Sequence, residues 1–566
     1  MRNKKSGCNK KLLVICLSGS VLTVLFLVIL FNLLVVIDPP QVKEISYSKQ
    51  DRIQLDTAIF VLGNNWLKRN SFGLWELYIE GGPYERGLVN GILTSELIKK
   101  QEAAFVDQIK TMIPNSFYLY FLKVFVAWFN RNLDEYIQLE YQKEIFGISK
   151  SASNEFNYIA SGYQRILNYH AAHDIGHALA DISIIGCTSF SVWDEATSDS
   201  SLLIGRNFDF YVGDEFAKEK IVAFINPSKG YKFMMVTWGG MIGVVSGMNE
   251  HGLTVTLNAA KSDYPTSAAT PISLVAREIL QYAKNIDEAY SIAKKRKTFV
   301  AESIMIGSKF DNKTAIIEKS PEQIGLFQTD SNYIICSNHY QSDTFINSPL
   351  NQQNIKESSS LYRYKRVEEL LNEKSKLNIN SIAEILRNKK GLKGQDIGLG
   401  NEKSINQLLA HHSVIFNPTK LIVWVSTNPY QLGNYVAYDL NKIFNNPQEK
   451  NLHKDIRTDS LTIPFDNFLL SSEYNNYLTF IKMKKLLLKI ISESREETIS
   501  HDQINDFIKS NPEQYQVYSL LGDYFKYQED EKEAIKYYDI ALKKEIATLR
   551  EKNEIKLKRI QLLDNE

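Results

Sequence analysis

The chain has few cysteines and almost no net charge for its length. It holds four cysteines among 566 residues, and its charged side chains sum to +1 at neutral pH. Two of the four, Cys8 and Cys16, stand near the amino terminus, which excludes a disulfide framework. The balanced charge gives no indication of nucleic-acid binding, because the aromatic residues are not interleaved with a basic patch. A hydrophobic content of 44% is ordinary for a folded protein.

A long hydrophobic run occupies residues 12–37. It contains no charged side chain, and at 1.5 Å per residue it is long enough to cross a hydrocarbon core of ~30 Å. Five basic residues in the tail 1–11 place that tail in the cytoplasm and the rest of the chain outside. No small-x-small cleavage site precedes Asp38, so we expect a single-pass membrane anchor instead of a cleaved signal peptide.

The sequence Gly186-Cys187-Thr188 opens an alternating strand and carries the most informative chemistry. A thiolate is a strong nucleophile, and cutting the bond before Cys187 would free an α-amino group that titrates near neutral pH and serves as a base. Gly186 suits self-cleavage, because a residue without Cβ tolerates a strained backbone. The alternative is that Cys187 is a small buried hydrophobic residue, which is the commoner fate of a free cysteine.

A second apolar run, residues 202–210, is predicted to be the neighbouring strand of a hairpin. It carries Arg206 and Asp209. Arg206 could hold the thiolate of Cys187, and Asp209 could orient the new amine. The hairpin would therefore bring three chemically useful side chains together.

Several further motifs follow in a fixed order. They are Gly82-Pro-Tyr-Glu-Arg-Gly87, Gly247-Met-Asn-Glu-His-Gly-Leu253, Thr256-Leu-Asn258, Cys336-Ser-Asn-His-Tyr340 and Ser360-Leu-Tyr-Arg-Tyr364. Together with the two runs above, they resemble the penicillin-acylating acyltransferases (acyl-CoA:6-aminopenicillanic acid acyltransferase). That family belongs to the self-processing N-terminal-nucleophile superfamily, and the motifs resemble choloylglycine hydrolases and acid ceramidase-like amidases more remotely. The resemblance covers about residues 75–440.

The resemblance implies a role for each polar residue of these motifs. Cys187 would be the nucleophile, with Arg206 and Asp209 beside it. Asn258 would face the tetrahedral oxyanion, and Asn338 would support the amino group or the oxyanion. Amide N–H donors of this kind typically supply a few kcal/mol of transition-state stabilisation.

Two further polar residues have alternative explanations. Arg363 would complete the polar shell, but it stands on a predicted helix, 361–371, where a surface role is the alternative. Asn249 lies between two apolar runs in a sequence typical of a β-turn, so we treat it as a turn residue. No cofactor and no metal is implied.

The pattern after Thr188 predicts an α+β fold, a four-layer αββα sandwich of the N-terminal-nucleophile type. We expect residues 38–186 to be mostly helical, residues 187–450 to form the catalytic domain and residues 465–566 to form a helical extension. The predicted strands are 222–225, 233–238, 242–246, 253–257, 303–306, 314–317, 325–328, 333–336, 413–416 and 421–426; the predicted helices are 271–295, 361–373 and 379–387.

Three helical segments have alternative interpretations. Residues 117–129 are apolar nearly all round and favour a core helix over a membrane-surface helix that admits lipids. His173 and His177 are one helical turn apart, as a metal pair would be, but the zinc-protease motif is not met. In the extension, Gly522 and its neighbours match one tetratricopeptide unit, which we expect to pack on its neighbours or on the catalytic domain, with a protein partner as the alternative.

These observations predict a membrane-anchored, extracytoplasmic, self-processing cysteine amidase or acyltransferase. Its substrate would be an acyl amide, a thioester or a lipid-like small molecule, with Cys187 carrying the acyl group. Three alternatives remain. The chain could be an inactive scaffold with a partner-binding tail, an unprocessed cysteine hydrolase with His339 as its base, or a metal-dependent hydrolase that uses His173 and His177.

Overall fold

The computed structural model describes residues 10–564 apart from short gaps. The gaps are residues 44, 46, 48, 49, 114, 180–185, 211, 212, 262–266, 446–452, 454 and 494–496. For residues 10–17, 19, 172, 173 and 175–179 only the backbone is described. The side chains of His173 and His177 therefore lie outside the described residues.

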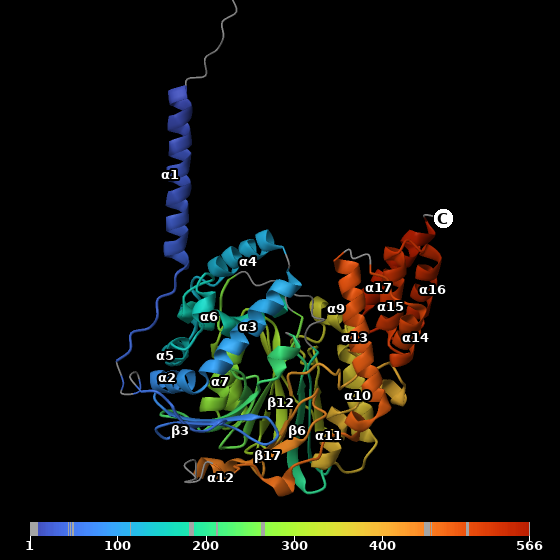
Figure 1. Cartoon of the computed structure of the whole chain (residues 1–566). Helices are drawn as coiled ribbons and strands as arrows, with labels where there is room; N and C mark the ends of the chain where they lie inside the picture. The colour runs from blue at the N-terminus through green and yellow to red at the C-terminus, as the bar shows by residue number, and fades with distance from the viewer. Residues whose placement is uncertain are drawn as a thin grey trace, which may run out of the picture.

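Two β-sheets form the centre of the molecule (Figure 1). The larger sheet has eleven strands in the order β1 (Ile53–Asp56), β2 (Ile59–Leu62), β3 (Asn65–Arg69), β4 (Trp75–Gly81), β7 (Ile221–Pro227), β8 (Phe233–Thr237), β9 (Ser246–Asn249), β10 (Leu253–Ala259), β11 (Glu302–Ser308), β12 (Lys313–Lys319) and β13 (Ile324–Phe327). The smaller sheet has six, in the order β14 (Tyr333–Cys336), β5 (Thr188–Asp194), β6 (Ser200–Phe208), β15 (His412–Asn417), β16 (Ile422–Ser426) and β17 (Tyr435–Asp439).

Helices cover the outer faces of both sheets. The larger sheet is covered by the apolar sides of α2 (Pro83–Leu93), α7 (Ile272–Tyr282) and α8 (Ile286–Lys295). The smaller sheet is covered by those of α10 (Ser360–Asn372) and α11 (Ile379–Leu386). Between the sheets lies a separate apolar core, in which Phe224 and Tyr438 pack ring against ring at 5.6 Å. Each such side chain contributes roughly 1.5–3 kcal/mol by leaving water. The predicted αββα layers are therefore present.

The segment before Cys187 contributes four strands to the larger sheet, in addition to the helices expected over most of residues 38–186. Residues 53–81 form β1 to β4, and helices begin only at α2. Between strands of the described residues, β4 and β7 form the one parallel pair, with seven residues in register from Trp75 opposite Ile221. Because β4 precedes Cys187 and β7 follows it, this ladder joins the two parts of the chain across the predicted cleavage point.

Two other predicted elements differ from the structure. The helix predicted over 271–295 is divided into α7 and α8, because the Asn249 amide donates hydrogen bonds to the carbonyls of Leu280 and Ala283 and ends α7 there. Residues 242–245 form no strand, since the Val244 N–H bonds to the Ser273 carbonyl at the start of α7. The Asn249 side-chain oxygen also accepts from two turn N–H groups, which confirms its turn role.

Helix α4 (Ser116–Phe129) is not the core helix that the sequence favoured. None of its residues, all of which the structure describes, is buried, and Phe117 and Tyr120 are 79% and 65% exposed. The other helices of this region are α3 (Ser95–Met112), α5 (Leu139–Ser149) and α6 (Gly162–Leu179). Only the end of α4 reaches the core around α5 and α6, where Phe129 packs edge to face on the buried Phe299 ring at 6.3 Å.

Helix α1 (Lys10–Val35) covers most of the predicted anchor and projects from the body on the side of α4 (Figure 1). Its ring of Phe31 stacks on Trp128 of α4 at 6.1 Å. Within the described part of the chain, no helix meets the length and apolarity needed to span a membrane.

The carboxyl-terminal extension is a helical bundle that packs on the catalytic domain. Its helices are α13 (Ser472–Ser492), α14 (His501–Ser510), α15 (Tyr515–Tyr527), α16 (Glu531–Ala541) and α17 (Leu549–Leu563). The residues of the predicted repeat form the α15–α16 hairpin, in which a Cβ at Gly522 would lie 2.5 Å from the Tyr538 ring. The bundle contacts the catalytic domain through Asn511, whose side-chain amide donates to the Leu399 carbonyl at 2.8 Å.

Gly87 has a packing role that can be tested. A Cβ at Gly87 would lie 1.9 Å from the backbone oxygen of Glu144, because α2 and α5 touch backbone to backbone. We expect Gly87→Ala to lower the free energy of unfolding by about 1–3 kcal/mol. Gly82→Ala in the same motif is the control, since its Cβ would meet nothing closer than 3.9 Å. Denaturant unfolding of both variants measures the difference, and equal stabilities would contradict this account.

Candidate active site

Cys187 stands at the entrance to β5, and the strand pairing brings Arg206 beside it. In the register of β5 and β6, Ser189 lies opposite Arg206 and Thr188 opposite Asn207. Cys187 is only 1% exposed, and burial raises the pKa of its thiol to about 11, although the nearby Arg206 charge opposes that rise. In the intact chain the sulfur is therefore a protonated thiol at neutral pH.

Arg206 connects the sulfur to both sheets. One Nη lies 3.8 Å from the Cys187 sulfur and donates to the Leu257 carbonyl of β10, while the other donates to the Ser246 hydroxyl of β9 at 2.5 Å. The guanidinium also lies 4.4 Å from the centre of the Phe208 ring. A fully buried cation with these partners can stabilise a thiolate, because charge-assisted bonds are stronger in a dry environment.

Asp209 is a buried carboxyl next to the Gly186–Cys187 peptide. Burial raises its pKa to about 7, against the opposing influence of Arg363 and Arg206. Its backbone oxygen accepts the Gly186 N–H at 3.0 Å, and its carboxyl oxygens lie 3.4 Å and 3.5 Å from the side-chain nitrogens of Gln407 and Gln431. Asp209 therefore titrates in the range where a general base is most useful.

Gly186 is buried, and its carbonyl oxygen accepts a hydrogen bond from Gln407 Nε2 at 2.6 Å. That glycine at position 186 tolerates the strain of the attack stays a prediction. A Cβ there would lie 2.5 Å from the Gln407 nitrogen, so the missing Cβ lets this amide approach the carbonyl.

Asn258 and Asn338 are both buried near the two strands but are engaged with backbone groups. Asn258 Nδ2 donates to the Cys336 carbonyl at 2.9 Å, and its oxygen accepts from the Ser189 hydroxyl at 2.8 Å. Asn338 Nδ2 donates to the Ala259 carbonyl at 2.8 Å. Their roles at an oxyanion stay predictions.

Arg363 is buried at 3% exposure, so the surface alternative is wrong. Its guanidinium donates to Asn338 Oδ1 at 2.5 Å, to the Thr188 hydroxyl at 3.2 Å and to the Glu402 carbonyl at 2.8 Å. Helix α10 thus places a cation beside the first residue of β5. Its role in the polar shell of a catalytic site stays a prediction.

Sequence reasoning missed several groups that the fold brings to this place. They are Ser246, Glu302, Gln407, Gln431 and His412. The His412 Nε2 lies 2.8 Å from the Ser246 hydroxyl, and burial lowers the pKa of His412 well below its usual value, so its ring is neutral. The Asn-Gln pair at 406–407 falls in a loop without hydrophobic periodicity, and nothing in that pattern indicates its position.

The alternative sites have different surroundings. The ring of His339 contacts the Ser360 hydroxyl at 2.7 Å and packs against Tyr364 at 5.6 Å, and burial lowers its pKa to about 4. No cluster of three or more histidine, cysteine or acidic side chains that could hold a metal ion occurs among the residues described by the structure.

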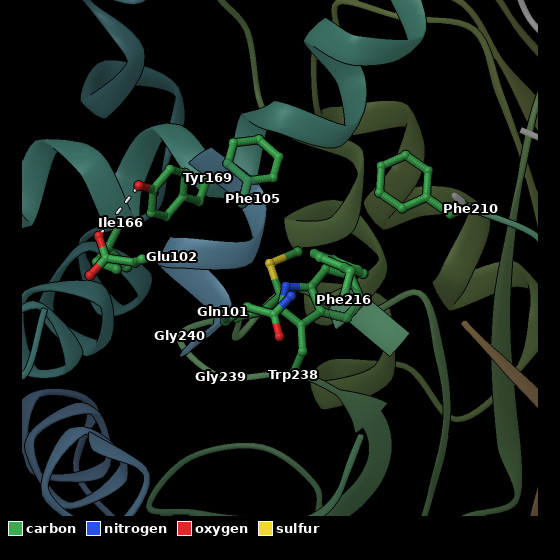
Figure 2. A pocket seen from close by; sticks show the side chains of 11 residues that line it. Gln101, Glu102, Phe105, Ile166, Tyr169, Phe210, Phe216, Trp238, Gly239 and Gly240 are labelled. Atoms are coloured by element: carbon green, nitrogen blue, oxygen red, sulfur yellow. Dashed lines mark hydrogen bonds between the residues drawn. The ribbon is translucent and has the colours of Figure 1, made fainter. Parts of the chain in front are cut away.

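An aromatic cavity of about 40 Å³ lies close to the site, between α3, α6 and the loop after β8 (Figure 2). Its lining includes Phe105, Tyr169, Phe210, Phe216 and Trp238. The Phe208 ring, which covers the Arg206 guanidinium, stacks on Phe210 at 5.7 Å and on Trp238 at 6.5 Å. The aromatic cluster therefore extends from the cavity to the residues around Cys187.

Comparisons with known proteins show which family part of the chain resembles. Residues 196–427 match the model of the family described as "Acyl-coenzyme A:6-aminopenicillanic acid acyl-transferase". This range includes the predicted site residues from Arg206 to Arg363, while Gly186 and Cys187 lie just before it.

Two relatives illustrate the similarity. An uncharacterized protein of Archaeoglobus fulgidus is 26% identical over 277 residues, which cover 46% of each chain. The N-acylethanolamine-hydrolyzing acid amidase of Caenorhabditis elegans is 23% identical over 224 residues, or 38% of this chain and 59% of that protein. The chain spans about half the length of the curated relatives it matches.

Two solved structures are also similar to parts of the chain. The ortholog of the acid amidase from Caenorhabditis elegans has a TM-score of 0.30 at 17% identity and covers 41% of this chain and 93% of its own. A variant of conjugated bile acid hydrolase from Clostridium perfringens has a TM-score of 0.31 at 14% identity and covers 50% and 97%. At such low TM-scores the fold assignment depends on the strand order and layers described above. The match over residues 196–427 confirms the resemblance that the motifs predicted, so this chain is similar to the acyl-CoA:6-aminopenicillanic acid acyltransferase family, whose enzymes are amidases or acyltransferases of the N-terminal-nucleophile type.

Proposed function

We propose that the protein is a cysteine amidase or acyltransferase that activates itself by cleaving the Gly186–Cys187 bond. The observation that supports this most directly is that a buried thiol, a cation and a hydrogen-bonded carbonyl lie together at the Gly186–Cys187 bond. An Nη of Arg206 lies 3.8 Å from the Cys187 sulfur, and Gln407 donates a hydrogen bond to the Gly186 carbonyl that the sulfur would attack. A simple core cysteine requires neither contact.

Self-cleavage proceeds in two chemical steps. The Cys187 sulfur loses its proton to Asp209 and attacks the Gly186 carbonyl carbon, and the tetrahedral intermediate expels the Cys187 nitrogen, which takes up a proton. The Gly186 acyl group is then held as a thioester. Water attacks this thioester, which gives a carboxylate on Gly186 and a free thiol and α-amine on Cys187.

The mature enzyme would use the same groups on a substrate. The α-amine of Cys187 removes the thiol proton, the sulfur attacks the acyl carbonyl, and the protonated amine gives its proton to the leaving nitrogen. Asn258 would supply an oxyanion donor once it releases the Cys336 carbonyl that it binds in the intact chain. Water or an amine then takes the acyl group from the sulfur.

The aromatic cavity favours an apolar acyl group. Its walls include Phe210 and Trp238, which stack on the Phe208 ring beside Arg206, and such rings bury apolar surface without requiring hydrogen bonds. A volume of about 40 Å³ holds little more than one water, so the cavity must widen before a fatty or aryl group can enter. The substrate is therefore proposed to be an acyl amide, thioester or lipid-like molecule with an apolar acyl part.

The first experiment compares the intact mass of the wild type with that of Cys187→Ala. We expect two fragments that meet between Gly186 and Cys187 in the wild type and one uncut chain in the variant, because the variant lacks the attacking sulfur. An uncut wild type whose thiol reacts with iodoacetamide would support the unprocessed hydrolase instead. An uncut wild type with an inert thiol would support the scaffold.

The pH dependence of self-cleavage tests the role of Asp209. Its carboxyl accepts a proton only when ionised, so we expect the cleavage rate to rise with pH and to level off above its pKa of about 7. Asp209→Asn should cleave at least ~100-fold more slowly and without this pH dependence. Mass spectra of timed samples measure both rates. A rate that falls from pH 5 to pH 8 would contradict the assignment.

We also propose that the protein works at a lipid surface outside the cytoplasm, as the basic tail predicts. Helix α4 exposes Phe117, Tyr120 and Phe121, and its Trp128 stacks on Phe31 of α1. Its one lysine, Lys123, is turned to the Tyr158 carbonyl at 2.6 Å. An exposed apolar helix that adjoins a second one is the surface that the headgroup region of a bilayer accepts.

Lipid contact of α4 is tested with brominated phosphatidylcholine vesicles, which quench nearby tryptophan. The variant Phe117→Trp should emit more tryptophan fluorescence than the wild type, and the vesicles should quench this additional fluorescence. Phe310→Trp is the matched control, since Phe310 is 73% exposed in the turn between β11 and β12. We expect at least roughly twofold stronger quenching of the added signal at 117, because a residue inserted in the acyl boundary meets the bromines directly. Equal quenching at both positions would count against the proposal.

A further inference from the structure

Gln407 holds the bond that self-cleavage would break. Its Nε2 donates to the Gly186 carbonyl oxygen at 2.6 Å, although 221 residues separate the two in the sequence. We infer that Gln407 is the oxyanion donor of self-cleavage, which stabilises the negative oxygen that forms on Gly186 when the Cys187 sulfur attacks. This inference rests on the proposed self-cleavage.

The geometry suits an oxyanion more than a resting peptide. A donor already within hydrogen-bond distance of the oxygen requires no rearrangement when charge develops there. Gln407 is 2% exposed, so water does not compete for the same oxygen, and the hydrogen bond strengthens as its acceptor becomes charged. The steric requirement for glycine at position 186 has the same cause, because any Cβ would push this donor away.

Asp209 couples this donor to the proton transfer. Gln407 Nε2 lies 2.6 Å from the Gly186 oxygen and 3.4 Å from Asp209 Oδ2, so one nitrogen faces both acceptors. When the thiol proton moves to Asp209, the carboxyl loses its charge while the Gly186 oxygen gains one. In the same step, the hydrogen bond from Gln407 to the Gly186 oxygen therefore becomes stronger than its contact with Asp209.

The loop around Gln407 is held in an unusual conformation. The next residue, Leu408, has a φ of +54°, which costs a non-glycine residue of the order of 1–3 kcal/mol. The Asn406 side chain accepts the Leu408 N–H at 3.0 Å, and Tyr477 of α13 donates its hydroxyl hydrogen to the Leu408 carbonyl at 3.3 Å. Such strain persists because the surrounding contacts, including those of the carboxyl-terminal bundle, fix the loop.

The test compares Gln407→Ala with Gln431→Ala in the full-length chain. Both glutamines are buried and both contact Asp209, but only Gln407 contacts the Gly186 oxygen. Timed intact-mass measurements should show cleavage slowed about 100-fold or more in Gln407→Ala, as for loss of one oxyanion donor, and by far less in Gln431→Ala. Gln407→Glu, which keeps the shape but replaces the donor by an acceptor, should be as slow as the alanine variant.

Thermal unfolding of the uncleaved variants, each combined with Cys187→Ala, separates folding defects from loss of the donor. Hydroxylamine, which cuts thioesters, supplies a second readout. If Gln407 acts when the sulfur attacks, Gln407→Ala accumulates intact peptide and hydroxylamine does not accelerate its cleavage. Acceleration by hydroxylamine, equal slowing in both alanine variants, or unchanged cleavage in Gln407→Ala would each overturn the inference. A wild type that never cleaves would instead overturn the proposed function itself.

Discussion

A single buried guanidinium links the two sheets at the nucleophile. Arg206 extends from β6 of the smaller sheet, and its donors reach Leu257 and Ser246 on β10 and β9 of the larger one. A charge removed from water costs several kcal/mol unless its hydrogen bonds are satisfied, so the spacing of the sheets and the position of Arg206 depend on each other. The Cys187 sulfur lies 3.8 Å from one Nη of the same guanidinium. The sulfur is therefore placed by the packing of the whole sandwich.

The sequence allowed good predictions wherever chemistry follows from local spacing. Cys187 and Arg206 lie on adjacent strands of one hairpin, so alternation and a short turn were enough to bring them together. The layers also followed, since strands and helices alternate in the expected order. Gln407 could not be found in this way, because it stands 221 positions after Gly186 and its loop meets Gly186 only in the folded chain. Periodicity also failed for α4, because an apolar helix has the same pattern whether it is buried or exposed.

Two glycines of the sequence motifs permit close approaches between other parts of the chain. Gly87 lies where two helices touch backbone to backbone, and Gly186 lies where an amide must approach a carbonyl. Gly87 does not have the positive φ that usually explains glycine. In both places the missing Cβ permits a close approach, once for packing and once for chemistry, and sequence alone does not distinguish the two.

Cleavage at a buried peptide would change the site electrostatically as well as covalently. It would create a carboxylate on Gly186 and an amine on Cys187 beside Asp209, where burial already raises a carboxyl pKa to about 7. Ionising two carboxyl groups at one buried site costs free energy, because the charges repel and both lose their hydration. The new carboxylate would therefore be more stable in water. The β4–β7 ladder would meanwhile keep the amino-terminal part in the larger sheet. Departure of the Gly186 end alone would leave the Gln407 donor and the Cys187 sulfur facing the space that a substrate carbonyl must enter.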